Sequence, residues 1–453
     1  MEYSNECDRE YTKSDGGVIM SKLAILGGEK VRKELFPAYK VIGKEEEDAV
    51  VQVLRSGILS KYLGCWADDF YGGPQVQALE KEWAEHFGVK HAISVNSATS
   101  GLYCAAGAIG LNPEDEVIVS PYTMAASATA PLIYNAIPVF ADIEKEHFCL
   151  DPESIEERIT EKTKAIIVVD IFGQPYDAER INAIAKKHHL YVIEDTAQAP
   201  GAKYKGKFAG TLGDIGVFSL NYHKHIHCGE GGIVVTDNDE LAERVRLIRN
   251  HAEAVVGAKG TKNLNNMIGF NLRMTEVEAA IAREQLKKLD WLLEERQKNV
   301  AYLEKKLDKI PFLRVPKVRE GCEHAYYVHP IFFDKERAGV SRETYIDAVK
   351  AELMPITLRE AEGVSIGCGY VKPLYLQPLF QEKIAYGDHG YPFCNSKVDY
   401  SKGICPNCEQ LHFETLFTHE LMRPFMTKED LDDVVAAFYK VCLLYTSPSP
   451  RDV

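Results

Sequence analysis

One lysine lies among three histidines in the segment SLNYHKHIHCGEGG, residues 219–232. Ser219 closes an apolar run that is typical of a β-strand, and Lys224 follows five residues later. A lysine in an apolar, partly desolvated setting can act as a nucleophile toward a carbonyl group. The glycine cluster GEGG permits a tight turn into the next strand. Lys224 is therefore a candidate nucleophile, and a solvated surface lysine is the alternative.

The three histidines, at positions 223, 225 and 227, alternate along this segment. They would share one face if the segment were extended, so an HxHxH metal site is conceivable. No carboxylate or cysteine is placed nearby to complete such a site. We therefore expect no metal here.

Two other segments carry polar residues directly after apolar runs. YVIEDTAQ places Asp195 at the end of a predicted strand and Gln198 three residues further on. VNSATSG passes from a predicted strand into a helix through Ser97, Ala98 and Thr99. Backbone amides at a helix N-terminus bind phosphate well. Taken singly, each segment is also explained by ordinary helix capping.

The three segments together indicate one kind of site. An enzyme that uses pyridoxal phosphate needs a lysine for the Schiff base, an acid beside the pyridine nitrogen and a cradle for the phosphate. The chain supplies a cradle, then Asp195, then Ser219 and Lys224, each at the carboxyl end of a predicted strand. Ligands of open α/β sheets bind at that edge. The sequence therefore predicts a pyridoxal phosphate site.

Apolar runs and helical patterns alternate through most of the chain. The runs lie at 91–95, 116–120, 138–143, 165–170, 191–195, 217–220 and 232–237, and helical patterns at 74–86, 98–110, 152–161 and 177–188 accompany them. Continuous Val/Ile runs suit strands that are buried on both faces of a sheet. This alternation predicts an α/β fold with a mainly parallel, seven-stranded sheet and helices on both faces.

A helical pattern runs without interruption from Thr275 to about Leu307 and predicts one long helix. Beyond Pro311 the pattern becomes that of a smaller α+β domain. We predict an unstructured extension at 1–21, a large cofactor-binding domain at 22–300, a small C-terminal domain at 301–442 and a Ser/Pro-rich tail at 443–453, which we interpret as non-native.

Charge and cysteine content limit the partners. The 53 basic and 67 acidic residues give a net charge of −14. Nucleic acids and anionic membranes favour basic surfaces, so we expect neither as a partner. No apolar stretch approaches the roughly 20 residues that cross a bilayer. Eleven scattered cysteines without a compact framework indicate free thiols in a reducing compartment, which favours a cytoplasmic location.

The chain resembles the DegT/DnrJ/EryC1/StrS family of sugar aminotransferases, which are fold type I pyridoxal phosphate enzymes. The matching stretches include HAISVNSATSGLYCA, YVIEDTAQAPGAKYKGKFAGTLGDIGVFSL, KHIHCGEGGIVVTD and GFNLRMTEVEAAIAREQL, and the likeness spans roughly residues 22–441. Lys224 matches the Schiff-base lysine. A branch of the family has histidine there and performs dehydration, so Lys224 favours transamination.

The resemblance assigns further roles by position. Asp195 matches the acid that pairs with the pyridine nitrogen, and Gln198 matches the residue near the cofactor's phenolic oxygen. The phosphate contacts are matched by Ser97, Ala98, Thr99 and Ser219. Asn271, in GFNLRM, matches a residue that reaches the phosphate from the partner subunit, which implies a homodimer with shared active sites. Met124 departs from the pattern because it stands where an aromatic side chain commonly stacks on the ring.

The resemblance implies transfer of an amino group from L-glutamate or L-glutamine to a keto sugar, in amino-sugar or polysaccharide biosynthesis. A nucleotide-linked 4-keto-6-deoxyhexose is the acceptor that we expect. Family members that act on keto-inositols share the N-terminal pattern LAILGGEKVR, so a keto-inositol is an alternative acceptor. The same fold also serves dehydratases, aromatizing enzymes and regulatory proteins that bind pyridoxal phosphate, and each of these functions stays open.

Overall fold

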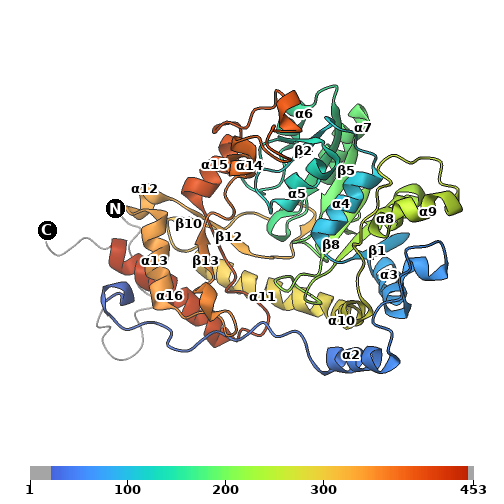
Figure 1. Ribbon diagram of the computed structural model, residues 1–453. Helices are drawn as coiled ribbons and strands as arrows, with labels where there is room; N and C mark the ends of the chain where they lie inside the picture. The colour runs from blue at the N-terminus through green and yellow to red at the C-terminus, as the bar shows by residue number, and fades with distance from the viewer. Residues whose placement is uncertain (1–21, 447–453) are drawn as a thin grey trace.

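The structure is a computed structural model that describes residues 22–446. The predicted extension at 1–21 and most of the predicted tail lie outside the described residues. Helix α16 (Lys428–Thr446) continues beyond residue 442, where the sequence analysis placed the end of the small C-terminal domain. Figure 1 shows a larger part, which is built around a central sheet, and a smaller part that contains α16.

A seven-stranded sheet forms the centre of the larger part. Its strands are His91–Val95 (β1), Glu116–Val119 (β2), Ile137–Phe140 (β3), Thr163–Val169 (β4), Tyr191–Asp195 (β5), Ile215–Ser219 (β8) and Gly232–Thr236 (β9). Their order is β1–β9–β8–β5–β4–β2–β3. The pairs from β8 to β3 are parallel, whereas β9 is antiparallel to both β1 and β8. All seven predicted runs are strands, and the mainly parallel sheet is confirmed.

Helices follow most of these strands, and further helices lie in the rest of the chain. They are α2 (Lys44–Ser56), α3 (Pro74–Phe87), α4 (Ala98–Ala108), α5 (Ala126–Thr129), α6 (Pro152–Arg158), α7 (Ala178–His188), α8 (Asp239–Arg249), α9 (Ala252–Lys259), α10 (Glu276–Leu286), α11 (Leu289–Leu307), α12 (Lys335–Ala338), α13 (Arg342–Glu352), α14 (Pro378–Gln381) and α15 (Pro406–Gln410).

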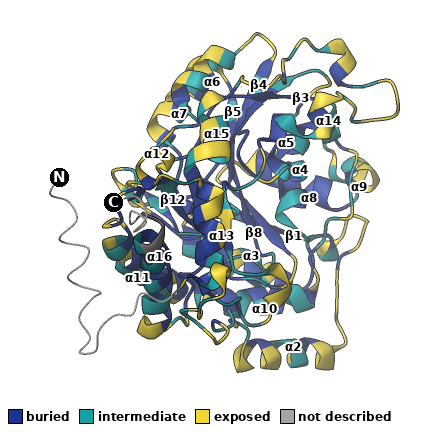
Figure 2. Ribbon diagram, turned by 90° about the vertical axis from the view of Figure 1, so that its left-hand side faces the viewer, coloured by how far each residue is buried: buried dark blue, intermediate teal, exposed yellow. Residues whose placement is uncertain are grey.

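Both faces of the large sheet are covered. Side chains of successive strand residues point to opposite faces. On β8, Val217 packs in one core cluster with residues of α4 and α8, whereas Phe218 packs in another with Trp83 of α3 and residues of α10. Figure 2 shows the strands buried beneath helices whose outer sides are exposed. The sheet is therefore the middle layer of three, as the sequence predicts.

The smaller part is built on an antiparallel sheet. Its strands are Leu313–Arg314 (β10), His329–Phe333 (β12), Ile366–Cys368 (β13) and Leu416–His419 (β14), in the order β10–β12–β14–β13. Residues of α11, α13 and α16 pack with this sheet in a separate core cluster. A third, three-stranded sheet joins β11 (Cys322–Glu323) to β6 (Lys203–Tyr204) and β7 (Lys207–Phe208). The predicted division at residue 300 falls within α11 and stays a prediction.

The single long helix predicted from Thr275 to Leu307 is wrong. The chain forms α10 and α11, which are separated at Lys287 and Lys288. The Lys288 N–H bonds the carbonyl of Gln285, three residues back, so the α-helical ladder is interrupted there. An apolar period of 3.6 residues continues across such a break, which is why the sequence pattern did not reveal it.

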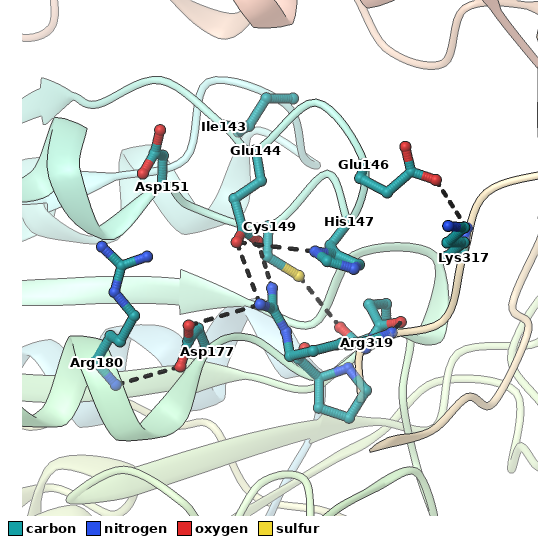
Figure 3. Close-up of polar contacts among 12 residues, drawn as sticks. Ile143, Glu144, Glu146, His147, Cys149, Asp151, Asp177, Arg180, Lys317 and Arg319 are labelled. Atoms are coloured by element: carbon teal, nitrogen blue, oxygen red, sulfur yellow. Dashed lines mark hydrogen bonds and ion pairs between the residues drawn. The ribbon is translucent and has the colours of Figure 1, made fainter. Parts of the chain in front are cut away.

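A buried ion-pair cluster, which we call the Arg319 network, joins the segment before β12 to the loops of the large sheet (Figure 3). The Arg319 guanidinium donates to Glu144 Oε1 at 3.2 Å and lies 3.6 Å from Asp177 Oδ2. The Arg319 backbone N–H bonds the side-chain oxygen of Gln174 at 3.2 Å. Because the Arg319 side chain is only 11% exposed, this contact holds the two parts together in a largely water-free setting.

Candidate active site

Sheet register brings three of the predicted site residues into one row. Gly232 at the start of β9 pairs with Val95 of β1 on one side and with Ser219 of β8 on the other. Ser97 follows Val95 by two residues, so it lies beside Gly232 at the carboxyl edge of the sheet. Asp195 ends the next strand along, β5, where it pairs with Val217 of β8. The sheet therefore assembles residues that are far apart in the sequence.

The N-terminus of α4 forms a cradle of backbone amides. Ser97 caps the helix by accepting the N–H of Ser100 at 3.1 Å. The first helical amides, at Ala98 and Thr99, have no partner within the helix by its geometry. A Cβ at Gly232 would lie 2.6 Å from the carbonyl carbon of Ser97 and 2.7 Å from the nitrogen of Ala98. Only glycine therefore allows β9 to approach this cradle so closely.

Asp195 is a buried acid, with 5% of its surface exposed. Its Oδ2 accepts the Ser127 hydroxyl at 2.7 Å, and its Oδ1 accepts the Ala197 N–H at 3.1 Å. Burial raises the pKa of Asp195, although these two hydrogen bonds and the charge of Lys224 act in the opposite direction. The carboxylate is thus held in place, but no cation of the described chain contacts it to repay its desolvation.

Lys224 lies in the loop between β8 and β9 and is half-buried. Its Nζ is 4.2 Å from the centre of the Tyr327 ring. Among residues 22–446, its ammonium makes no ion pair and no side-chain hydrogen bond. Lys224 is therefore partly shielded from water, as its predicted role requires, and that role stays a prediction.

Both polar atoms of the Gln198 side-chain amide make hydrogen bonds. Its Oε1 accepts the N–H of Phe172 at 2.8 Å, and its Nε2 donates to the Tyr370 hydroxyl at 3.0 Å. Phe172 belongs to the turn after β4, and Tyr370 follows β13 of the small sheet. Gln198 thus connects the large sheet to the smaller part of the chain.

The three histidines separate into different environments. His225 is fully buried, and its Nε2 contacts the carbonyl of Ala325 at 2.9 Å. Burial lowers the pKa of His225 well below its usual range, and it also lowers the pKa of His223 and His227. The described part of the chain has no group of three or more His, Cys, Asp or Glu side chains placed to hold a metal ion.

Two predicted residues lie at the surface of the single chain. Met124, in the loop before α5, is 64% exposed. Asn271 is also exposed, and its Oδ1 accepts the Arg273 Nε at 2.7 Å. The structure therefore brings Ser97, Asp195 and Ser219 together at the carboxyl edge of the sheet, with Lys224 in the loop that follows β8. Met124 and Asn271 lie at the surface instead.

Sequence reasoning missed four residues that surround the site: Ser127, Phe172, Tyr327 and Tyr370. Ser127 lies three residues after Met124, and no local pattern distinguishes it from an ordinary helix residue. The two tyrosines come from segments far beyond Lys224 in the sequence. Only the folded chain brings them to the site, so no spacing rule could identify them.

The arrangement fits pyridoxal phosphate. The helix N-terminal amides and a hydroxyl at the cradle suit a dianionic phosphate, and the buried Asp195 suits a pyridinium nitrogen. Lys224, whose ammonium has no ion pair within residues 22–446, suits an aldehyde. A mainly parallel sheet that carries these groups at its carboxyl edge defines a fold type I pyridoxal phosphate enzyme. No described helix is long and apolar enough to span a membrane.

Comparison with known proteins gives the family. The model of the DegT/DnrJ/EryC1/StrS aminotransferase family matches residues 40–439, and the chain belongs to that family. The spore coat polysaccharide biosynthesis protein SpsC of Bacillus subtilis is 33% identical over 403 residues, which are 88% of this chain and 94% of that protein. The protein is a pyridoxal phosphate-dependent sugar aminotransferase with small-molecule substrates.

Two solved structures share the fold. The aminotransferase from Psychrobacter cryohalolentis is 30% identical, with a TM-score of 0.75 over 89% of this chain and 97% of that one. DesI, crystallised in the presence of its TDP-sugar product, is 25% identical, with a TM-score of 0.75 over 92% of this chain and 95% of that one.

Proposed function

We propose that this aminotransferase moves an amino group from L-glutamate or L-glutamine to a nucleotide-linked 4-keto-6-deoxyhexose. The observation that carries the proposal is the half-buried Lys224 ammonium, which has no ion-pair partner among the described residues and lies near the buried Asp195. The likeness to DesI, whose structure was determined with its TDP-sugar product, supports a nucleotide sugar as the acceptor.

Lys224 is the catalytic base in this proposal. Its Nζ would hold the cofactor through the aldehyde group, and its amine would take the proton from the α-carbon of the amino donor. Bound pyridoxal phosphate supplies the electron sink for this proton transfer. With a keto sugar as the acceptor, the same amine would give a proton to the carbon that receives the amino group.

Asp195 would hold the proton on the pyridine nitrogen of the bound cofactor. Its two hydrogen bonds, from Ser127 and from the Ala197 N–H, fix the carboxylate before the cofactor binds. A preorganised charge in a buried site interacts more strongly than the same charge in water. The raised pKa of Asp195 reflects burial without a contacting cation from the described chain, and the pyridinium is the cation that would complete this position.

The other predicted residues orient the cofactor. Ser97, Ala98 and Thr99 bind the phosphate at the start of α4, and Ser219 binds it from the adjacent strand end. Gln198 donates to the phenolic oxygen. Met124, 64% exposed in the single chain, would be the side chain beside the cofactor ring.

We further propose a homodimer with shared active sites in the cytoplasm. Exposed Asn271 is available to a second copy of the chain, whose phosphate site it would complete. The described cysteines that precede Cys442 in the chain are free thiols, which suits a reducing compartment. Mixing Lys224→Ala chains with Asn271→Ala chains tests sharing, because one site of each mixed dimer would regain both residues. Recovery of activity supports the proposal, and its absence in verified mixed dimers contradicts it.

The substrate proposal is tested by a two-stage assay. Purified holoenzyme is first given L-glutamate or L-glutamine in a single turnover, and formation of pyridoxamine phosphate separates an enzyme from a regulatory protein that only binds the cofactor. Nucleotide keto-sugars and keto-inositols are then offered, and products are read by mass spectrometry. Amination of a 4-keto-6-deoxyhexose nucleotide supports the proposal. Amination of keto-inositols alone, or loss of water without amine transfer, contradicts it.

A further inference from the structure

The orientation of the Gln198 amide is fixed by its neighbours. The N–H of Phe172 can only donate, so the atom of Gln198 that it meets at 2.8 Å must be the oxygen. The amide nitrogen is thereby turned toward the Tyr370 hydroxyl, which it meets at 3.0 Å. Gln198 is only 4% exposed, so water does not compete for these contacts. The amide has one orientation rather than two.

One of the two N–H groups of the Gln198 amide has no acceptor among the described residues. The nitrogen of a glutamine amide carries two N–H groups, and the Tyr370 hydroxyl accepts one of them. The second has no hydrogen-bond partner among residues 22–446. A buried donor without a partner is costly, so a ligand atom that accepts it is expected to bind strongly.

The Phe172 peptide is held in a conformation that such a residue rarely adopts. Its φ is +60° and its ψ is −2°, in the left-handed region that is uncommon for bulky side chains. The turn is secured on its other side, where the Phe172 carbonyl accepts the Tyr327 N–H at 2.7 Å. A residue held in this way at a site indicates a positioning role. The same residue thus contacts Gln198 and the tyrosine that lies against Lys224.

Tyr370 comes from the smaller part of the chain and is packed into place. Its ring packs edge-to-face against two aromatic rings. The centroid of the Tyr370 ring lies 5.1 Å from that of Phe172 and 6.0 Å from that of Tyr122. Burial raises the pKa of Tyr370, so its hydroxyl is neutral at physiological pH and can accept from the amide. The hydroxyl is therefore a fixed polar atom at the end of a rigid aromatic contact.

We propose that Tyr370 is a positioning residue for the transamination. Its hydroxyl, together with the strained Phe172 peptide, fixes the Gln198 amide so that one N–H of Nε2 is kept for the phenolic oxygen of bound pyridoxal phosphate. The inference rests on the proposed function, in which Gln198 serves that oxygen. It adds a residue from the segment that follows β13 to the group that controls the cofactor.

The test is the pH titration of holoenzyme absorbance in Tyr370→Phe. A donor on the phenolic oxygen withdraws negative charge that would otherwise stabilise a proton on the neighbouring linkage nitrogen. Loosening the Gln198 amide is therefore expected to raise the titration midpoint by about half a unit to one unit. The cofactor dissociation constant of the apo protein is expected to rise roughly two- to tenfold.

Two further variants separate positioning from packing. Tyr400→Phe also removes a buried tyrosine hydroxyl, which donates to the Pro138 carbonyl at 2.7 Å, and is expected to leave the midpoint unchanged. In a Gln198→Ala background, Tyr370→Phe is expected to add no further shift, because Tyr370 acts through that amide. An unchanged midpoint in Tyr370→Phe, or an equal shift in the Gln198→Ala background, overturns the proposal.

Failure of this inference is distinguishable from failure of the proposed function. Borohydride reduction followed by peptide mapping locates the cofactor attachment in native enzyme and in each variant. An adduct on Lys224 together with an unshifted Tyr370→Phe titration rejects Tyr370 alone. An adduct elsewhere in native enzyme rejects the site and, with it, this inference.

Discussion

The region around Lys224 and the Arg319 network both hold charged side chains away from water. Among the described residues, ion pairs balance these charges only in the Arg319 network. Arg319 contacts two carboxylates, Glu144 and Asp177, and its backbone is hydrogen-bonded as well. Within residues 22–446, the Lys224 ammonium lies against an aromatic ring without an ion pair, and Asp195 has no cation at contact distance. Removing one partner of a buried ion pair destabilises a fold because it leaves the other charge without compensation, whereas buried charges that have no ion-pair partner indicate a place for a ligand. The contrast predicts opposite responses to mutation.

Lys224→Ala is expected to have the largest effect of all. Amine transfer should fall by about 10²–10⁴-fold because the base that moves the proton is removed. The melting temperature of the apo protein should barely change, since the ammonium has no ion pair within the described chain to lose. Single-turnover formation of pyridoxamine phosphate measures the first effect, and thermal unfolding measures the second.

Lys205→Ala is the matched control. Lys205 is half-exposed and pairs with Glu179 at 2.5 Å, away from the sheet edge. This variant should keep full activity and native melting behaviour, as expected for a surface pair. Equal activity in the two lysine variants would contradict the role of Lys224.

Arg319→Met is expected to reverse the pattern. Removing one partner of a buried ion pair leaves Glu144 and Asp177 uncompensated, and the free energy of unfolding should fall by about 3 kcal/mol. Cofactor attachment at Lys224 should persist in the protein that remains folded. Denaturant unfolding of the apo protein measures the loss.

Arg314→Met provides the comparison for Arg319. Arg314 also binds a carboxylate, Glu146 at 2.7 Å, but its side chain is 52% exposed. Its replacement should change stability by less than about 1 kcal/mol. Similar losses in both arginine variants would mean that burial does not set the strength of the Arg319 network.

The sequence predicts the part of the site that follows from strand ends. Apolar runs place Asp195, Ser219 and the Ser97 turn at the carboxyl edge of one sheet, because parallel strands share that edge. Lys224 is recognised by its position between a strand and a glycine cluster. These inferences need only local patterns and one topological rule.

The remaining parts of the site depend on contacts that no local pattern records. Tyr327 and Tyr370 reach the site because separate segments return to the large sheet after long connections. Ser127 reaches Asp195 through space from the short helix α5. The break at Lys287 and Lys288 preserves the apolar period, so the sequence pattern does not reveal it. The missed site residues are tertiary effects, because distant segments supply them.

Asp195→Asn is expected to separate function from stability. Transamination should fall by roughly 10²–10³-fold, since a neutral amide cannot hold the pyridinium charge. The apo protein should become more stable by about 1 kcal/mol, because a buried carboxylate without a contacting cation is removed. Stability is measured on apo protein by denaturant unfolding. Destabilisation as large as that of Arg319→Met would contradict the contrast.

The smallest expected effect is in the acid range and comes from Glu144. Burial raises the pKa of Glu144, but hydrogen bonds with His147 and Arg319 outweigh it and hold the pKa below its ordinary value of 4.5. Its stabilisation is therefore complete above about pH 4.5 and is lost as the pH falls through the folded-state pKa. Asp195 has the opposite sign, because its pKa is raised above 3.8 and its ionisation costs stability as the pH rises.

Glu144→Gln should remove the Glu144 part of this pH dependence while leaving Arg319 paired with Asp177, so its loss of stability at pH 7 should be smaller than that of Arg319→Met. Asp195→Asn should remove the opposing part and steepen the acid loss. Thermal unfolding of the apo variants between about pH 3 and 6 measures both slopes. Identical slopes in native protein and in both variants would show that folding shifts the pKa of neither carboxylate in the direction given above.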